Sequence, residues 1–94
     1  MHVDAQSNVR ISAVLEKMAE IFAGAKMPDW ASALRRHRSY LSDDPSGARA
    51  GVLAMYAGMG SLNDIVIFVD GVLAEDINVE LEELRTRLFD LCAT

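Results

Sequence analysis

A chain of 94 residues has room for one hydrophobic core, and we therefore predict a single domain over residues 1–94. Its composition, with 51% hydrophobic and 24% charged residues, is that of a packed globule and excludes intrinsic disorder. A formal net charge of −5 repels phosphate backbones and anionic headgroups, so neither nucleic acid nor a membrane surface is an expected partner.

The apolar residues and the cysteine content predict where the chain works. No apolar run reaches the roughly 18–20 residues that a bilayer-spanning helix needs, and residues 1–10 lack the order of a signal peptide. The single cysteine, Cys92, has no partner for an internal disulfide, which fits a reducing compartment. We therefore predict a cytoplasmic location.

The first predicted helix covers residues 9–25, where apolar side chains recur at spacings of three and four. Asp4 and Ser7 are candidates for its N-cap, and Gly24 stands where a left-handed residue would end it. The apolar stripe consists of Ile11, Val14, Leu15, Met18, Ile21, Phe22 and Ala25.

Two shorter helices follow, each opened by a proline that suits the first helical turn. The second is predicted over residues 28–42 and places Trp30 on its apolar face, so we expect this side chain to be buried against the first helix. The third is predicted over residues 45–57 and contains Gly47 and Gly51. Because glycine inside a helix costs about 0.5–1 kcal/mol relative to alanine, we expect a neighbouring helix to approach the backbone closely there.

Residues 65–74 fit two structures. Their apolar positions satisfy a helical spacing, but the run before Asp70 is rich in strand-forming residues. The dipeptide Asp70-Gly71 is a strong two-residue turn and favours a short hairpin that pairs residues 67–69 with residues 72–74. We prefer the hairpin and keep the helix as the alternative.

The last predicted helix has Asn78 as its N-cap and acidic side chains in its first turn. Leucines recur in it at spacings of three and four, and with Ile77 they form a seam that serves either as core or as the contact of a homodimer. These leucines are Leu81, Leu84, Leu88 and Leu91. The chain is thus predicted to be mainly α, a small compact helical domain of about four helices with a possible short β-hairpin near residues 65–74.

The sequence contains no constellation typical of catalysis or metal binding. The histidines and Cys92 are isolated from one another, whereas a zinc site needs several ligands at short spacing. Cys92 has only acidic or apolar neighbours in sequence and no base that would activate it as a nucleophile, so it is interpreted as a small apolar filler. We therefore expect no enzyme activity, no metal and no cofactor.

Charge is unevenly distributed along the chain. The basic run of Arg35, Arg36 and Arg38 fans around the second helix and does not form a stripe that would follow phosphates. Acidic residues gather in the second half, which suits a basic protein partner. They include Asp64, Asp70, Glu75, Asp76, Glu80, Glu82, Glu83 and Asp90.

Residues 55–64 resemble the hallmark of a family of small bacterial proteins of unassigned activity. A methionine–tyrosine pair ends a helix, a Gly-Met-Gly-Ser turn follows, and an Asn-Asp pair leads into an apolar stretch. Members of such families are often found beside secreted toxins, so the resemblance implies an immunity-type protein that neutralises a toxin by stoichiometric binding. The candidate partner-binding residues are Tyr56, Gly58, Met59, Gly60, Ser61, Asn63 and Asp64, joined by Asp70 and Asp76 from the acidic half.

Two other classes stay open beside the immunity role. One is a small helical adaptor or homodimeric scaffold without a toxin partner, in which the leucine seam forms the contact. The other is an enzyme or ligand-binding domain built around Asn63 and Asp64. The same two residues also have a purely structural alternative, as caps of the element that follows them.

Overall fold

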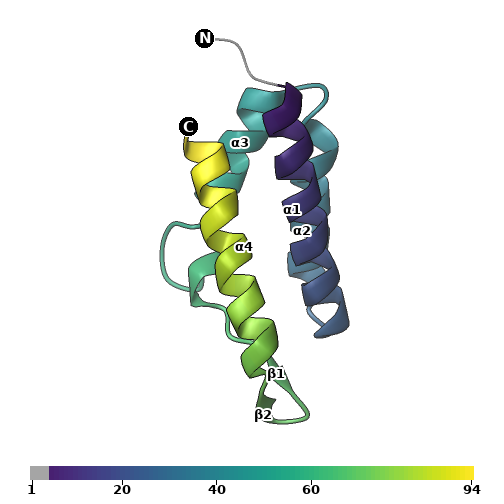
Figure 1. Cartoon of the computed structure of the whole chain (residues 1–94), viewed down its shortest axis with the longest axis vertical. Coiled ribbons are helices and arrows are strands. Elements are labelled where there is room, and N and C mark those ends of the chain that lie inside the picture. Colours follow the sequence, from purple (N-terminus) through teal and green to yellow (C-terminus); the bar gives the residue numbers. More distant parts are fainter. Residues whose placement is uncertain (1–4) are drawn as a thin grey trace.

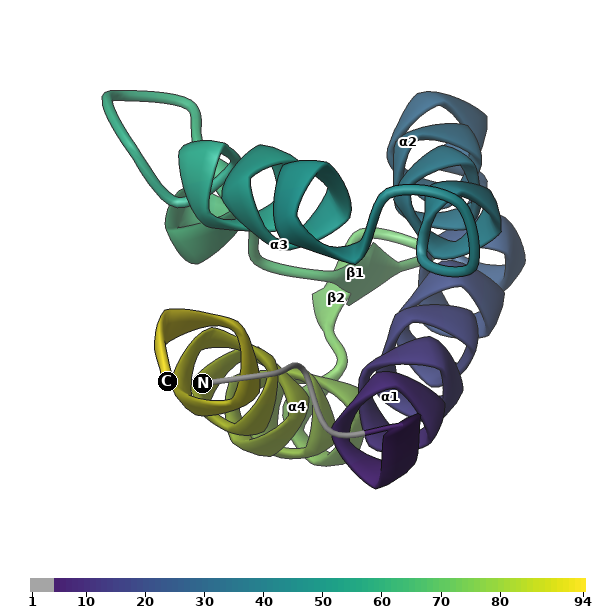
Figure 2. The ribbon, with the colours of Figure 1, turned by 90° about the horizontal axis from the view of Figure 1, so that it is seen from above.

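Four α-helices surround the hydrophobic core of the computed structural model, which describes residues 5–94 (Figure 1). They are α1 (Ala5–Gly24), α2 (Pro28–Tyr40), α3 (Pro45–Ala54) and α4 (Glu75–Ala93). Seen from above, the helices form a ring in which each packs against the next, and α4 closes the ring against α1 (Figure 2). No helix in the described part of the chain is long and apolar enough to cross a membrane. The predicted mainly α fold with four helices is confirmed.

The chain between α3 and α4 forms a short 3₁₀ helix, η1 (Leu62–Asp64), and an antiparallel hairpin with strands β1 (Phe68–Val69) and β2 (Val72–Leu73). Both residues of the connecting turn are left-handed, with φ of 52° at Asp70 and 77° at Gly71, as expected for a tight two-residue turn. The predicted hairpin is confirmed and the helical alternative is wrong. Each strand is shorter than predicted.

The leucine seam of α4 lies inside the core. Leu81 and Leu88 are fully buried, Leu84 is nearly so and Leu91 is partly buried, so these leucines serve chiefly as core. Ile77, at the start of the seam, stays at the surface, whereas Ile67 before the hairpin is buried. The largest fully buried side chains are Phe22, Ile11, Leu15, Met18, Leu34, Leu62, Ile67, Leu81, Leu88 and Val52.

The ends of α1 differ from the prediction. Residue 5 is already helical, so Ser7 lies within the helix and is not its cap, while Asp4 lies outside the described residues. The left-handed residue after the helix is Lys26, with φ of 62°, and not Gly24. The reason is that helical hydrogen bonding continues past Gly24: the Ala25 N–H still donates to the carbonyl of the residue four positions earlier.

The start of α4 also differs, because the helix begins at Glu75 and Asn78 is not its N-cap. The Asn78 side chain instead accepts a hydrogen bond from the Ile67 N–H (2.8 Å) and donates to the carbonyls of Ile67 (2.9 Å) and Ala74 (2.8 Å). Asn78 therefore fastens the hairpin to the first turn of α4. Helices α2 and α3 end sooner than predicted; after Ala54 the backbone hydrogen bonds tighten to a spacing of three residues.

Trp30 packs against α1 as predicted but is only partly buried. Its ring stacks on Phe22, with 6.0 Å between the centroids and 30° between the ring planes. Because Trp30 lies in the first turn of α2, it reaches the end of α1 and covers the core there without filling it.

The two glycines of α3 have separate structural reasons. A Cβ at Gly51 would lie 2.6 Å from Cε1 of His37 in α2, so the imidazole packs directly on the α3 backbone. A Cβ at Gly47 would meet the carboxylate of the N-cap Asp44, which accepts a hydrogen bond from the Gly47 N–H (3.0 Å). The expected approach of a neighbouring helix therefore holds at Gly51, through a side chain, and is wrong at Gly47.

Replacing Gly51 separates helix propensity from the His37 contact. In a His37→Ala background, Gly51→Ala is expected to raise the free energy of unfolding by about 0.5–1 kcal/mol, because alanine favours the helix. In the wild-type background the new methyl group meets the imidazole, and this gain is expected to vanish or reverse. Urea titrations of the four chains give the coupling energy. Equal effects of Gly51→Ala in the two backgrounds would contradict this contact.

Candidate functional site

The predicted glycine–methionine–glycine turn forms an exposed loop between α3 and η1 (Figure 1). Gly58 and Gly60 have φ of 82° and 73°, values that residues with a side chain rarely adopt. Between them, Met59 has 99% of its surface exposed. Among the loop residues predicted to bind a partner, Met59 is therefore presented fully to solvent.

Asp64 holds the loop together from its C-terminal end. Its carboxylate accepts hydrogen bonds from the N–H groups of Gly60 (2.8 Å) and Ser61 (3.3 Å). Ser61 itself is buried, at 7% exposure, so little of its surface is available for contact with a partner. Asp64 is thus a capping residue, but it caps the start of η1, to which it belongs, and not the element that follows it. Asn63 is exposed on the surface of η1.

Arg85 of α4 fastens this loop to the helix bundle, although it was not among the predicted site residues. Its side chain is buried, and Nη1 donates to the carbonyls of Leu62 and Ile65, both at 3.0 Å. Nη2 forms an ion pair with Glu82. The Arg85 carbonyl in turn accepts a hydrogen bond from the Tyr56 hydroxyl (2.7 Å). Tyr56 and Arg85 therefore clamp the two ends of the segment to α4.

The sequence does carry a signal for Arg85. It lies four residues after Leu81 and three before Leu88, on the buried face of α4, and a cation on such a face must find hydrogen-bond acceptors. The Tyr56 ring also packs edge-on against Phe89, with centroids 5.2 Å apart. Burial raises the pKa of Tyr56 above its ordinary value, so the hydroxyl stays a donor.

The predicted partner-binding residues do not form one surface. Those of residues 56–64 lie on or next to the loop, alongside the middle of α4 (Figure 1). Asp70 lies in the hairpin turn and Asp76 in the first turn of α4, at the opposite end of that helix from the C-terminus (Figure 1). The structure therefore brings the loop residues together and separates them from the two aspartates.

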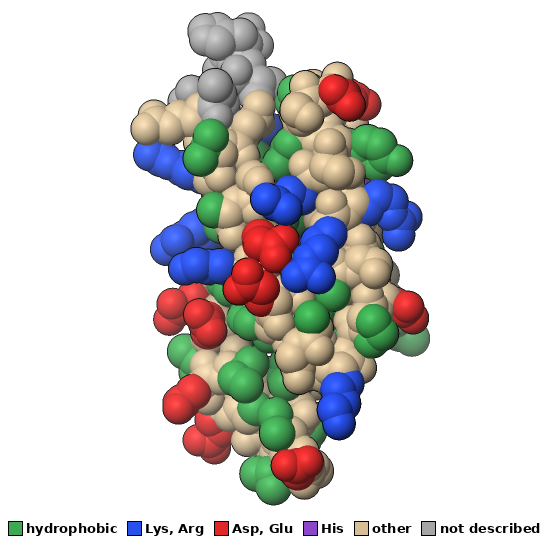
Figure 3. All heavy atoms as spheres, turned by 90° about the vertical axis from the view of Figure 1, so that its right-hand side faces the viewer, with side chains coloured by type: hydrophobic (Ala, Val, Ile, Leu, Met, Phe, Trp, Pro, Cys, Tyr) green, Lys and Arg blue, Asp and Glu red, His purple; other side chains and the backbone are tan. Residues whose placement is uncertain are grey.

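Large apolar side chains are exposed around Asp70 and Asp76. We call this surface the hairpin end. Its apolar residues are Val66, Phe68, Val69, Val72, Leu73, Ile77 and Val79, and its exposed acids are Asp70, Glu75, Asp76 and Glu80. Figure 3 shows hydrophobic and acidic side chains with one basic side chain in the lower part of one face, whereas the other basic side chains lie higher up. The sequence indicates such a surface by placing more apolar residues in this short segment than a two-stranded hairpin can bury.

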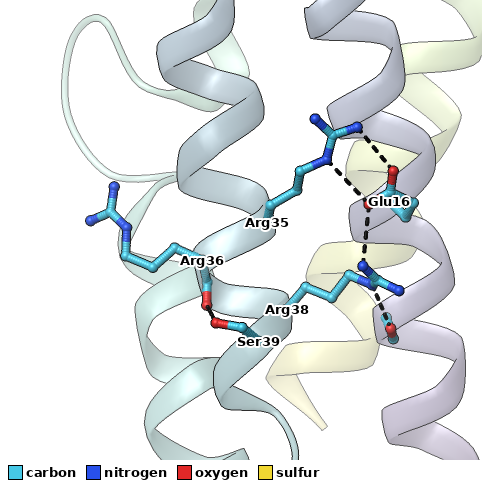
Figure 4. A network of polar contacts seen from close by, with 6 residues as sticks. Glu16, Arg35, Arg36, Arg38 and Ser39 are labelled. Carbon is cyan, nitrogen blue, oxygen red and sulfur yellow. Dashed lines mark hydrogen bonds and ion pairs between the residues drawn. The ribbon is translucent and has the colours of Figure 1, made fainter.

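A polar network joins α1 and α2 (Figure 4). Arg35 binds the Glu16 carboxylate through Nε (3.3 Å) and Nη2 (3.0 Å), and Arg38 approaches it through Nη1 (3.4 Å). The hydrogen bond from Arg35 lowers the pKa of Glu16. Arg36 points away from them (Figure 4). The predicted fan is wrong for Arg35 and Arg38, because residues three apart share a helix face.

The described residues contain no group of three or more His, Cys, Asp or Glu side chains that could hold a metal ion. Cys92 is buried at 6% exposure, as expected for an apolar filler, and this burial raises its pKa to about 11. At neutral pH the group is therefore a thiol and a poor nucleophile.

A family described as a domain of unknown function, DUF6966, matches residues 23–75, which is more than half of the chain. The chain belongs to this family. The DUF6966 match includes the whole loop, η1 and the hairpin, and it stops at the first residue of α4. Arg85, which clamps the loop, lies beyond the matched residues. The comparisons found no matching curated protein and no matching solved structure.

Separate substitutions at Asn63 and Asp64 distinguish an exposed side chain from one that stabilises the loop. Asp64→Ala is expected to lower the free energy of unfolding by about 1–2 kcal/mol, because the N–H groups of Gly60 and Ser61 lose their acceptor. Asn63→Ala is expected to leave stability within about 0.5 kcal/mol, as usual for an exposed side chain. Thermal melts followed by circular dichroism measure both. Equal stability of the two variants would show that the Asp64 cap is unimportant.

Proposed function

We propose that this chain binds another protein and, in the cytoplasm, neutralises a secreted bacterial toxin by forming a stoichiometric complex with it. The observation that carries the binding function is the hairpin end, whose seven large apolar side chains are 36% to 68% exposed. Phe68 with Leu73 and Val69 with Val72 lie on the two faces of the hairpin, so both faces carry exposed apolar side chains. Large exposed apolar side chains gathered in one region are typical of an interface. The toxin as partner rests on the resemblance of residues 55–64 to toxin-associated immunity proteins.

The loop supports the same proposal as a second, smaller contact. Met59 is fully exposed, and methionine adapts its shape readily to an apolar partner surface. The bonds that Asp64 accepts and the Tyr56–Arg85 clamp hold the loop in one conformation. A prearranged loop loses little conformational entropy on binding.

The two other classes receive less support from the geometry. A homodimer that pairs through the leucine seam is disfavoured, because the side chains of Leu81, Leu84 and Leu88 are buried in the core of the monomer. Around Asn63 and Asp64, the Asp64 Oδ2 atom accepts both backbone N–H bonds, so this carboxylate serves to cap η1 in the structure. A scaffold that uses the hairpin end for self-association stays an outcome of the experiments below.

The test of the proposed function is co-expression of the chain with the toxin encoded next to its gene. We expect the cells to survive and the two proteins to elute together as a 1:1 complex from a sizing column. Death of the cells with both proteins folded and soluble would refute the neutralising role. A 1:1 complex in cells that still die would support the binding function and refute the neutralising role.

A further inference from the structure

The hairpin is too short to bury its own side chains. Strands β1 and β2 have two residues each, and all four side chains are exposed. Ile67, directly before β1, is the residue that anchors this segment in the core, at 1% exposure. A two-stranded hairpin is marginally stable by itself in water. The fold therefore supports the hairpin at its base and leaves its outer surface available.

The hairpin end is nevertheless held in a defined conformation. Asn78 bonds both backbone groups of Ile67, and the Ala74 N–H donates to the Ile67 carbonyl (3.1 Å). The turn at Asp70 and Gly71 adopts the left-handed conformation that a two-residue hairpin requires. An apolar surface prearranged in this way can insert into a partner at a low cost in conformational entropy.

The charged residues that belong to the hairpin end itself are all acidic. The sequence contains no lysine or arginine between Arg49 and Arg85, and the four acids of the hairpin end are all exposed. Lys26 follows Ala25, which lines a pocket together with Val69 of the hairpin. An acidic rim around an apolar centre is complementary to a partner with an apolar groove bordered by lysine and arginine.

A small pocket beside the hairpin extends this surface. It has a volume of about 270 Å³ and lies between the end of α1, the hairpin and the first turn of α4. Its walls include Ile21 and Ala25 from one side and Val69 and Ile77 from the other, with Glu20 among the lining residues. Such a pocket can receive one apolar side chain from a partner, and its acid can meet a neighbouring cation.

A second copy of the chain is a less favourable occupant of this surface than a basic partner. A two-fold symmetric contact between hairpin ends would bring the acidic rims together, and like charges at an interface are unfavourable. A head-to-tail contact could use the basic pocket that Arg10, Lys17 and Arg87 line between α1 and α4, but contacts of that kind do not close into a dimer unless the rotation makes a ring.

We propose that the hairpin end inserts into an apolar groove, bordered by lysine and arginine, on a different protein. The inference rests on the proposed protein-binding function and names the surface and the chemistry of the partner. Apolar burial supplies the affinity, and the acidic rim sets the orientation and speeds association.

The test compares two valines of matched exposure. Val72 in the hairpin is 68% exposed and Val9 in α1 is 67% exposed. Two probes are titrated into the chain and followed by amide chemical shifts: the toxin encoded beside the gene, and a synthetic amphipathic peptide of leucine and lysine. A leucine–glutamate peptide of the same length serves as the charge control. Val72→Lys is expected to weaken binding of both basic probes by about tenfold or more, and Val9→Lys to leave it unchanged.

The outcomes separate the surface from the proposed function. Shifts confined to residues 66–79, preference for the lysine peptide and sensitivity to Val72→Lys support the inference. Equal binding of the two peptides, shifts elsewhere, or equal effects of Val72→Lys and Val9→Lys overturn it. Self-association that Val72→Lys abolishes also overturns it, in favour of a second copy. If the toxin does not bind while the lysine peptide binds at residues 66–79, the neutralising function fails and the surface inference stands.

Discussion

Replacing Arg85 by leucine is expected to lower the free energy of unfolding by about 2–5 kcal/mol, because the carbonyls of Leu62 and Ile65 would lose their donors in a largely buried environment. Leucine keeps most of the apolar volume, so the loss reports the hydrogen bonds and not a cavity. Urea denaturation followed by circular dichroism gives the value.

The matched control for Arg85→Leu is Glu82→Gln. The Glu82 side chain is 68% exposed and supplies the charge partner of Arg85 without holding the loop. Its substitution is expected to cost less than about 1 kcal/mol, as is usual for exposed ion pairs. If Arg85→Leu were as mild as Glu82→Gln, the loop would not depend on its attachment to α4.

Phe22→Ala is expected to cost about 3–5 kcal/mol, since Phe22 is completely buried among the helices and its removal leaves a cavity. Trp30→Ala is expected to cost less than Phe22→Ala, although tryptophan is larger, because Trp30 is only partly buried. Chemical denaturation of both variants gives the comparison. A larger loss of unfolding free energy for Trp30→Ala than for Phe22→Ala would mean that Trp30 contributes more to the core than its partial burial indicates.

Fluorescence quenching tests the same arrangement without a mutation. Trp30 is the only tryptophan of the chain. Its ring stacks on Phe22 and is partly exposed, so iodide is expected to quench native fluorescence partially. Quenching equal to that of the unfolded chain would mean that the stack does not form in solution.

The helices could be predicted because burial imposes a period on the sequence. The stripes of α1 and α4 run through the core, and the turn residues Asp70 and Gly71 correctly favoured the hairpin. Helix ends were less predictable, since they depend on bonds between distant segments. Asn78, for example, looks like a cap in sequence, but its side chain bonds the backbone of Ile67.

The candidate site was predicted less well than the fold. A glycine-rich segment with polar residues indicates an exposed loop, yet it does not show which polar groups the loop uses for itself. Asp64 and Tyr56 turned out to be attachments of the loop. Arg85 was missed because a cation in a helix with many charged residues looks like a surface residue. The hairpin end depends on how little of residues 66–79 the helices cover, which only the folded chain shows.

Hydrogen–deuterium exchange of the full chain, alone and in its complex with the co-encoded toxin, tests most directly whether the hairpin end is the binding surface. Hairpin residues are exposed, and their amides are expected to exchange faster in the free chain than those of the helical core, because a two-stranded hairpin opens locally at low cost. In the complex, exchange is expected to slow across residues 66–79, with a smaller effect at the Met59 loop. Protection confined to α1 and α2, with residues 66–79 exchanging as fast as in the free chain, would contradict it.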